Sequence, residues 1–353
     1  MLIFTEHVNA TYFISFDIPL QSLHSKGEVN FAVVSQQHVE LQGGNCWERW
    51  AEAFQPNVVV MTRYGHDSGR AIIDYFRRRG IPVIYHIDDN LLEIPDALGA
   101  EIQKRHGSLD VINTREYLLK NCDLIYASTS SLAELFKERF PQQKIFHGIY
   151  APYMGDMSQP NQTKKRKNPV IGYMGSKGHK HDLDLVVPAL EQLLEERSEL
   201  EFEVFGTIKM PKALERFGKR VRSHSVQKSY SEFLASLGSL KWDIGLAPLV
   251  DTKFNRCKAP TKFIEYSACG IPVVASDIPV YTTVIPAGGG VLVNDGWKNA
   301  ISYLLDHPQV RMDAISIAKR HCTQAFALPV LEQQLQHIFA TVLPSTKEIE
   351  NAL

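Results

Sequence analysis

Lys262 and Glu265 are the two residues whose types and spacing indicate chemistry most clearly. They lie three positions apart in a segment that reads as a helix beginning at Pro260 and ending at Gly270, so they share one helix face near its positive end. A helix start with lysines at 258 and 262 can hold a diphosphate. A carboxylate one turn deeper can accept both hydroxyls of a ribose. The segment therefore predicts a nucleotide-diphosphate pocket.

Further polar positions extend this candidate pocket. The predicted strand 169–175 ends in a glycine-rich turn, whose backbone amides can approach a diphosphate. Tyr230 precedes a predicted helix after a probable strand and is a further candidate for ligand contact. An ordinary turn and a tyrosine packed at a helix start are the alternatives. The predicted donor-binding residues are Gly175, Ser176, Lys177, Tyr230, Asn255, Lys258, Thr261, Lys262 and Glu265.

The pattern P-x-K-x-x-E-Y-x-A-C-G-x-P-V-V-A-S at 260–276 resembles the donor-site signature of GT-B-fold glycosyltransferases. It is most similar to the large retaining family 4, the glycosyl transferases group 1. The resemblance implies two Rossmann-like domains facing a central cleft, with a nucleotide-diphosphate sugar as co-substrate. It also implies retention of anomeric configuration, no metal and no cofactor. An ordinary helix–strand unit is the alternative for this segment.

The resembled family carries a second glutamate eight positions before Glu265, and here that position is Cys257. In one interpretation Phe254, Asn255 and Lys258 contact the donor sugar instead, and the sugar is a deoxy sugar with fewer hydroxyls. In the other interpretation the domain is inactive.

A second set of polar residues follows predicted strands in the first half of the chain. Asp88 and Asp89 follow the strand 81–87 and are expected to bind acceptor hydroxyls, or to act as base if the reaction inverts. Loop hydrogen bonds and a metal site are the alternatives. The predicted acceptor-binding residues are His7, Asn9, Thr11, Arg63 and Asp88. The predicted catalytic residues are Lys258, Lys262, Asp88 and Asp89, where the lysines stabilise charge on the departing diphosphate.

The elements that must position these residues alternate between strand and helix. This alternation predicts an α/β fold with doubly wound parallel sheets. The expected division is an acceptor domain at 1–157, a polar linker at 158–168 and a nucleotide-sugar domain at 169–327. The amphipathic helix in 328–353 packs back on the first domain in the resembled family. A helix is predicted over 182–196, with Asp182 as its N-cap.

Length and composition indicate a two-domain globular protein. The 353 residues carry a net charge of −1, which argues against nucleic acid as a partner. Five scattered cysteines, the absence of a signal peptide and of any long apolar run predict a cytoplasmic protein with reduced thiols. Basic runs at 77–79 and 164–167 suggest contact with anionic lipid at the inner face of the cell membrane, and a solvated surface is the alternative.

The predicted function is transfer of a sugar, of hexosyl or deoxyhexosyl type, from a nucleotide-diphosphate sugar to a saccharide or lipid-linked glycan. The setting suggested by the resemblance is synthesis of surface polysaccharide or glycoconjugate. The alternatives are an inactive GT-B-like partner subunit and a GT-B-like epimerase or phosphorylase. A dinucleotide oxidoreductase is disfavoured because neither half has G-x-G-x-x-G after its first strand. The sequence predicts no oligomeric state.

Overall fold

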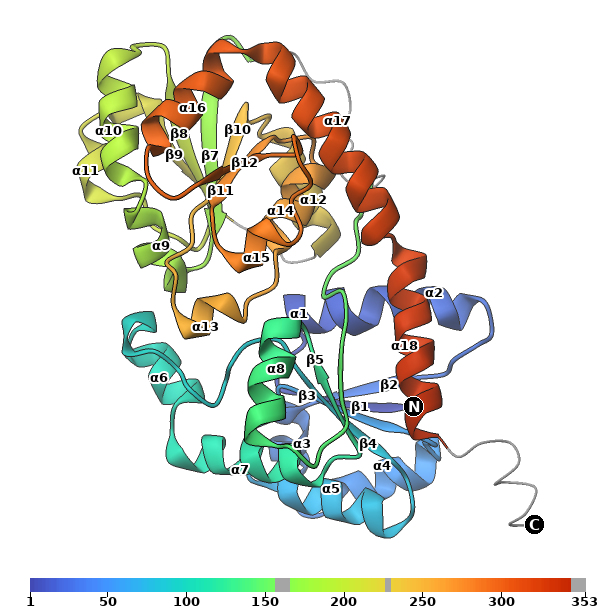
Figure 1. The fold of residues 1–353 in the computed structure, drawn as a ribbon. Helices are drawn as coiled ribbons and strands as arrows, with labels where there is room; N and C mark the ends of the chain where they lie inside the picture. The colour runs from blue at the N-terminus through green and yellow to red at the C-terminus, as the bar shows by residue number, and fades with distance from the viewer. Residues whose placement is uncertain (156–165, 226–229, 344–353) are drawn as a thin grey trace. The chain divides into compact units, whose positions relative to one another are not determined.

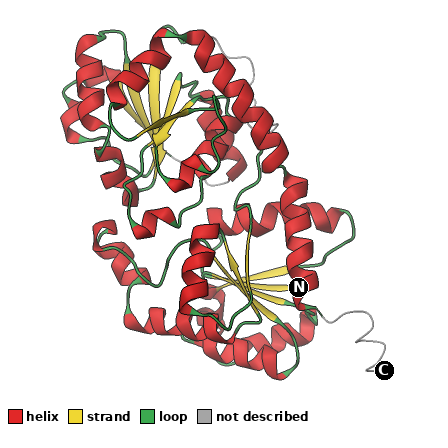
Figure 2. Ribbon diagram, viewed as in Figure 1, coloured by secondary structure: helices red, strands yellow, loops and turns green. Residues whose placement is uncertain are grey.

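The computed structural model describes residues 1–155, 166–225 and 230–343, which form two compact units (Figure 1). Unit 1 comprises Met1–Pro152, Cys257–Ala259 and the described part of Leu328–Leu353. Unit 2 comprises Tyr153–Arg256 and Pro260–Ala327. Most of the predicted linker, residues 158–165, lies outside the described residues. In each unit a central sheet carries helices on both faces (Figure 2).

The sheet of unit 1 is parallel in all its recorded pairings, with the order β2-β1-β3-β4-β5-β6. Its strands are β1 Leu2–Thr5, β2 Ala32–Ser35, β3 Val59–Thr62, β4 Val83–Ile87, β5 Leu124–Ala127 and β6 Ile145–His147. Its helices include α1 Ala10–Tyr12, α2 Ile18–Ser25, α3 Gln36–Gln42, α4 Cys46–Phe54, α5 Ser68–Arg78, α6 Ala100–His106, α7 Leu109–Asn121 and α8 Ser130–Arg139. The chain passes from β1 to β2 on one side and then to β3 on the other. The order therefore reverses between β1 and β3.

The sheet of unit 2 is likewise parallel, with the order β12-β11-β10-β7-β8-β9. Its strands are β7 Val170–Gly175, β8 Glu201–Gly206, β9 Val221–His224, β10 Ile244–Ala247, β11 Val273–Ser276 and β12 Val291–Val293. Its helices include α9 Lys180–Asp184, α10 Val187–Glu196, α11 Lys212–Glu215, α12 Tyr230–Ser239, α13 Lys253–Arg256, α14 Thr261–Ala268, α15 Pro279–Thr282, α16 Trp297–Asp306 and α17 Pro308–Ala325. Here the order reverses between β7 and β10.

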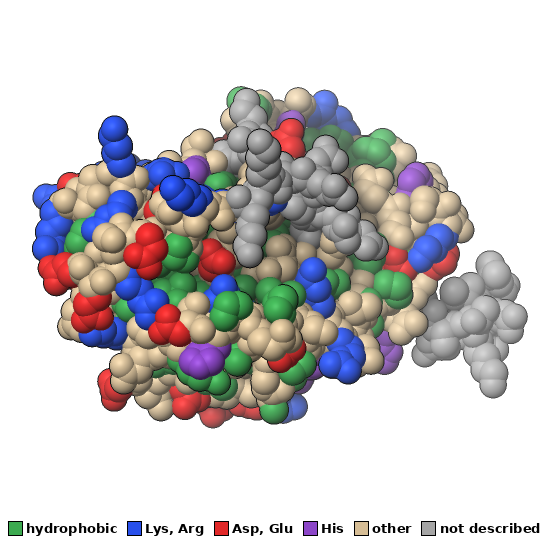
Figure 3. Space-filling view, turned by 90° about the horizontal axis from the view of Figure 1, so that it is seen from above, with side chains coloured by type: hydrophobic (Ala, Val, Ile, Leu, Met, Phe, Trp, Pro, Cys, Tyr) green, Lys and Arg blue, Asp and Glu red, His purple; other side chains and the backbone are tan. Residues whose placement is uncertain are grey.

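The central strands form where the sequence is continuously apolar. Strands β1, β3, β4 and β5 are buried at every position, as expected for parallel strands covered on both faces. The predicted α/β class with doubly wound parallel sheets is confirmed. Basic and acidic side chains are interspersed over the face drawn in Figure 3, in keeping with the near-zero net charge.

The predicted helix over 182–196 is wrong in one respect, because it is broken into α9 and α10. Pro188 occupies the second position of α10, where it has no N–H to donate to Asp184 and its ring crowds that carbonyl. The first of these helices begins at Lys180, so Asp182 lies inside α9 and is not an N-cap. The start of α14 also differs by one residue, since Pro260 is the N-cap and Thr261 the first helical residue. Gly270 ends that segment at φ 69°, as predicted.

Helix α18, Leu328–Val342, belongs to the core of unit 1. Its residues Leu335 and Ile338 are fully buried against side chains of the sheet, among them Val60 and Tyr126. The Gln334 Oε1 atom accepts a hydrogen bond from the Ile149 backbone at 2.8 Å. The apolar stripe of this helix is therefore part of what holds unit 1 together.

We predict that Leu335→Ala destabilises the protein by about 3 kcal/mol, because it leaves a cavity in a packed core. Thermal denaturation of the full chain should show a melting temperature lowered by several degrees. The control is Gln333→Ala on the exposed face of the same helix, which should melt as the wild type does. Equal melting of both variants would contradict the placement of α18 in this core.

Candidate functional site

Two clusters of polar side chains lie where the strand order of each sheet reverses. In open α/β sheets, ligands bind outside the carboxyl ends of the strands at such reversals, because the loops on either side lead away from each other. In unit 1 the reversal lies between β1 and β3, which end next to Glu6 and Arg63. In unit 2 it lies between β7 and β10. Most of the predicted site residues lie at or near one of these two positions.

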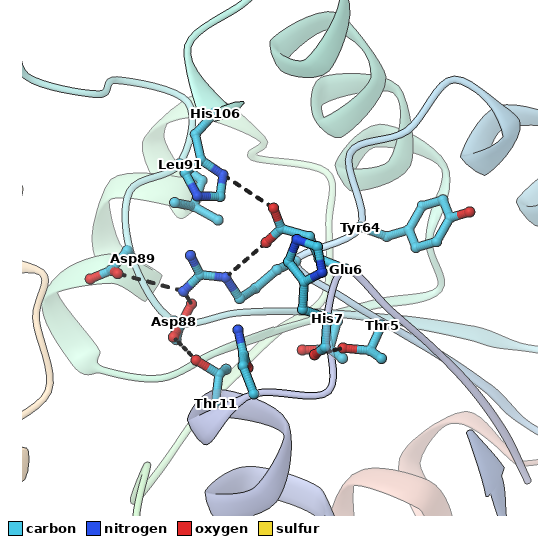
Figure 4. A network of polar contacts seen from close by, with 12 residues as sticks. Thr5, Glu6, His7, Thr11, Tyr64, Asp88, Asp89, Leu91 and His106 are labelled. Atoms are coloured by element: carbon cyan, nitrogen blue, oxygen red, sulfur yellow. Dashed lines mark hydrogen bonds and ion pairs between the residues drawn. The ribbon is translucent and has the colours of Figure 1, made fainter. Parts of the chain in front are cut away.

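Arg63 is the centre of the cluster in unit 1. Its backbone is left-handed, at φ 55°, a conformation that costs energy for a residue other than glycine. Its Nη1 atom donates to Asp88 Oδ1 at 2.6 Å and its Nε atom to Glu6 Oε2 at 3.3 Å. Asp89 Oδ2 lies 3.7 Å from the same Nη1 atom, and Figure 4 labels the three carboxylates Glu6, Asp88 and Asp89. The strained turn thus places one cation among three carboxylates.

Asp88 is held as an ionised structural group. Its second oxygen accepts hydrogen bonds from Thr11 Oγ1 at 2.8 Å and from the Tyr150 hydroxyl at 3.1 Å. Burial is the largest effect and opposes its ionisation, but Arg63, His86 and the hydrogen bonds from Thr11 and Tyr150 together outweigh burial, so the pKa of Asp88 lies below its ordinary value. A carboxylate with a lowered pKa and filled acceptor positions is a poor proton acceptor. The geometry therefore favours a positioning role for Asp88.

Asp89 lies in a different environment although it is the next residue. Its side chain is 29% exposed, and its Oδ2 atom is 3.7 Å from Arg63 Nη1. Burial and the neighbouring charge of Asp88 raise the pKa of Asp89, while Arg63 and Lys258 oppose the rise. Of the two aspartates, Asp89 is the one whose carboxylate can bind a ligand hydroxyl or accept a proton.

The remaining predicted acceptor residues have mixed environments. Asn9 caps α1, where its Oδ1 atom accepts from the Tyr12 backbone at 3.3 Å. Thr11 is committed to Asp88. His7 is exposed next to Glu6. Of these three residues, Thr11 contacts the Arg63 cluster directly, through Asp88.

Sequence reasoning missed several members of this cluster. Glu6 is 5% exposed and contacts Arg63, Arg105 and His106. Burial opposes ionisation of Glu6, but the nearby arginines Arg63, Arg115 and Arg105, together with His106, lower its pKa. The position of Glu6 directly after the first strand could have identified it as a site residue from the sequence. Tyr150 approaches Asp88 from a loop 62 residues away in sequence, and no local pattern predicts that contact.

In unit 2, the structure brings three of the predicted donor residues close to the end of β7. Glu265 is 7% exposed on α14, and the Tyr230 hydroxyl donates to its Oε1 atom at 3.0 Å. Burial raises the pKa of Glu265 to about 7, against opposing effects of Tyr230 and Lys262. The Lys262 ammonium lies 5.5 Å from the ring centre of Tyr173 on β7. A cation and a poised carboxylate therefore share the first turns of α14, as their spacing predicts.

The glycine-rich turn follows β7 directly. Gly175 ends the strand, and its carbonyl accepts from the Thr207 and Ile208 backbones at 3.1 Å each. Gly206 faces this carbonyl at φ 124°, and a Cβ there would lie 2.2 Å from it, so only glycine fits. Ser176 precedes the short 3₁₀ helix Lys177–His179, and Lys177 is exposed.

Asn255 is buried at 8% exposure and serves the protein's own structure. Its Nδ2 atom donates to the Val250 carbonyl at 2.8 Å and to Asp182 Oδ1 at 3.2 Å. The Asn255 amide nitrogen therefore lies inside the loop that follows β10, and its hydrogen bond to Asp182 holds it there.

Lys258 lies in the short segment of 257–259 that belongs to unit 1, and its charge acts on Asp89. The adjacent Cys257 packs into the core of unit 1, and its carbonyl accepts from Thr129 Oγ1 at 2.9 Å. Burial raises the pKa of its thiol to about 11. A neutral, buried thiol therefore occupies the position of the first glutamate in the resembled family.

Two further observations concern metal binding and membrane-spanning helices. Within the described ranges 1–155, 166–225 and 230–343, no three His, Cys, Asp or Glu side chains gather as metal ligands would. No helix in that part of the chain is long and apolar enough to cross a membrane.

Solved structures with the same architecture identify the fold as GT-B. HepE from Anabaena, in complex with UDP-glucose, has a TM-score of 0.66 at 12% identity over 96% of this chain and 99% of its own. Sucrose-phosphate synthase from Thermosynechococcus elongatus has 0.61 at 14% identity, over 84% and 76%. A UDP-forming trehalose-phosphate synthase from Burkholderia xenovorans has 0.62 at 11% identity, over 98% and 99%. No curated protein sequence matches the chain.

The match to a protein family lies almost entirely within unit 2. Residues 168–307 match the family described as glycosyl transferases group 1. The predicted resemblance to this group, the GT-B fold and the enzyme class of glycosyltransferase are confirmed.

We predict that Asp88→Asn and Asp89→Asn differ sharply in stability. Asp88→Asn leaves the largely buried Arg63 without its closest partner and should cost about 3 kcal/mol. Asp89→Asn removes a carboxylate that the neighbouring charge disfavours, so its change should stay below about 1 kcal/mol. Chemical denaturation of both variants beside the wild type measures this. Equal losses would show that Asp88 is not the structural partner of Arg63.

We predict that Glu265→Gln stabilises the protein more at pH 8 than at pH 5. The pKa of Glu265 is about 7 in the folded protein against an ordinary 4.5, so the folded state binds the proton more tightly. Wild-type stability should fall as pH rises through this window, by up to about 3 kcal/mol.

Glutamine does not titrate and should escape that loss. Melting temperatures at pH 5, 6, 7 and 8 measure the difference, with the exposed Glu215→Gln as control. A constant difference between Glu265→Gln and wild type across this range would contradict the raised pKa.

Proposed function

We propose that this protein transfers a glycosyl group from a nucleotide-diphosphate sugar to a saccharide or lipid-linked glycan. The observation that carries the proposal is the arrangement of Lys262, Glu265 and Tyr230 beside the carboxyl end of β7. It puts an ammonium group and a buried carboxylate where the reversal of the sheet leaves room for a ligand.

In this proposal Glu265 holds the ribose. Two ribose hydroxyls donate to its carboxylate, which favours the ionised form, so binding releases the proton that burial retains near neutral pH. Tyr230 keeps the carboxylate oriented through its hydrogen bond to Oε1. The nucleobase would then lie on the Tyr230 side of the Glu265 carboxylate.

The diphosphate is assigned to the N-terminus of α14 and to the turn after β7. Bond cleavage leaves negative charge on the departing diphosphate while the sugar becomes oxocarbenium-like. Donors fixed before the reaction stabilise that charge without reorganisation. Lys262, Thr261 and the turn 175–177 are the donors in unit 2, and Lys258 is proposed to add a further cation. The proposed reaction uses no metal and no cofactor.

Asp89 is the proposed acceptor-binding carboxylate. The family resemblance favours retention, in which case Asp89 orients the attacking hydroxyl. If the reaction inverts, its raised pKa suits it to accept the acceptor's proton. The buried Cys257 supports a donor sugar that needs no carboxylate at that position, such as a deoxy sugar. HepE was solved with UDP-glucose and with UDP, so uridine donors are the first to test.

We predict that one nucleoside diphosphate raises the melting temperature, because a ligand that binds only the folded state stabilises it. UDP, GDP, ADP and CDP are compared by thermal shift. Lys262→Ala and Glu265→Ala should abolish most of the shift. Lys298→Ala, a lysine on α16 in the same unit, should retain it. Unchanged shifts in both site variants would overturn this assignment.

Product analysis separates the proposed transferase from its alternatives. Nucleotide release that depends on a saccharide acceptor supports transfer. Conversion of the donor sugar without an acceptor would indicate an epimerase, and dependence on inorganic phosphate a phosphorylase. An inactive partner subunit would bind no donor and would be unaffected by Glu265→Ala.

A further inference from the structure

His179 and Asp182 form a bonded pair at the reversal of the sheet in unit 2. His179 ends the turn after β7, and its Nδ1 atom lies 2.8 Å from Asp182 Oδ2. Asp182 is 4% exposed, so its carboxylate is buried behind the more exposed imidazole of His179. The His179 side chain is 21% exposed.

The other oxygen of Asp182 reaches the far side of the reversal. Oδ1 accepts from the Val250 backbone at 2.9 Å and from Asn255 Nδ2 at 3.2 Å. Val250 follows β10, the strand beside β7. One buried carboxylate thus fixes both the turn after β7 and the loop after β10, which border the proposed diphosphate position.

This geometry sets what the imidazole can do. With Nδ1 held by Asp182, any bond from the ring to a ligand is made by Nε2. A carboxylate on Nδ1 orients the ring and favours its protonated form, in which Nε2 donates. A donor of that kind at a phosphate turn suits an anion whose charge increases during the reaction.

We propose that His179 is a catalytic residue that donates a hydrogen bond through Nε2 to the departing diphosphate, and that Asp182 positions it. This inference rests on the function proposed above. In the transfer, the bond between the anomeric carbon and the β-phosphate oxygen breaks with its electron pair on the diphosphate. The acceptor oxygen forms the new bond to that carbon, and its proton passes to the departing diphosphate. His179 retains its own proton throughout.

The experiment compares His179→Ala with His181→Ala, an exposed histidine two residues further along the chain. Thermal shifts are measured with the nucleoside diphosphate that stabilises the wild type most and with the corresponding nucleoside. His179→Ala should keep the nucleoside shift and lose most of the increment due to the diphosphate. Its kcat should fall about 100-fold with a smaller change in KM, and His181→Ala should match the wild type.

Added imidazole should restore part of the kcat of His179→Ala, and the restoration should disappear in the double variant with Asp182→Asn. A full diphosphate increment and a kcat within twofold of wild type would overturn the inference. Loss of the nucleoside shift together with a lower melting temperature without ligand would also overturn it, by showing a structural role. If no nucleotide shifts the wild type, the proposed function itself fails, and that result is distinct from either outcome.

Discussion

The reversal of strand order within each parallel sheet is the constraint on which both candidate sites depend. Loops on its two sides lead in opposite directions, so polar groups at the ends of the central strands lack neighbours from regular structure. Buried groups of this kind must find hydrogen bonds or counter-charges elsewhere. In unit 1 the Arg63 guanidinium supplies them for Glu6 and Asp88. In unit 2 Asp182 joins two loops, and Tyr230 supports Glu265. The contacts that satisfy the polar groups at the strand ends are therefore the same contacts that form the candidate sites.

The partner of each carboxylate, more than its burial, sets the chemistry available to it. Asp88 and Glu265 are both largely buried, yet their pKa values move in opposite directions. A guanidinium at 2.6 Å compensates Asp88, whereas a neutral hydroxyl at 3.0 Å compensates Glu265 only in part. The first arrangement gives a permanent charge that shapes the loop. The second leaves a group whose charge a ligand can change.

The sequence allowed the α/β class, the central strands and the pairing of Lys262 with Glu265 to be predicted, because strand burial and helix spacing are local patterns. The break before Pro188 was not predicted, although its signal was present in the sequence, since proline crowds the carbonyl four residues before it. The contact of Tyr150 with Asp88 was not, because it joins residues 62 positions apart. The buried position of Asn255 depends on Asp182 73 positions earlier, and tertiary contacts of this kind leave no periodicity. Cys257 was recognised as a departure from the family pattern, but its packing in unit 1 required the structure.

The discontinuity of unit 1 has a consequence for how the protein is made. Helix α18 contributes Leu335 and Ile338 to a core whose other members come mainly from the first 150 residues, and it is translated after all of unit 2. Unit 2 can therefore complete its own core on the ribosome while the earlier part of the chain still exposes an apolar surface. Domains usually fold in their order of synthesis, and here the domain begun first is finished last. During that interval the nascent chain has an aggregation-prone face that a chaperone can recognise.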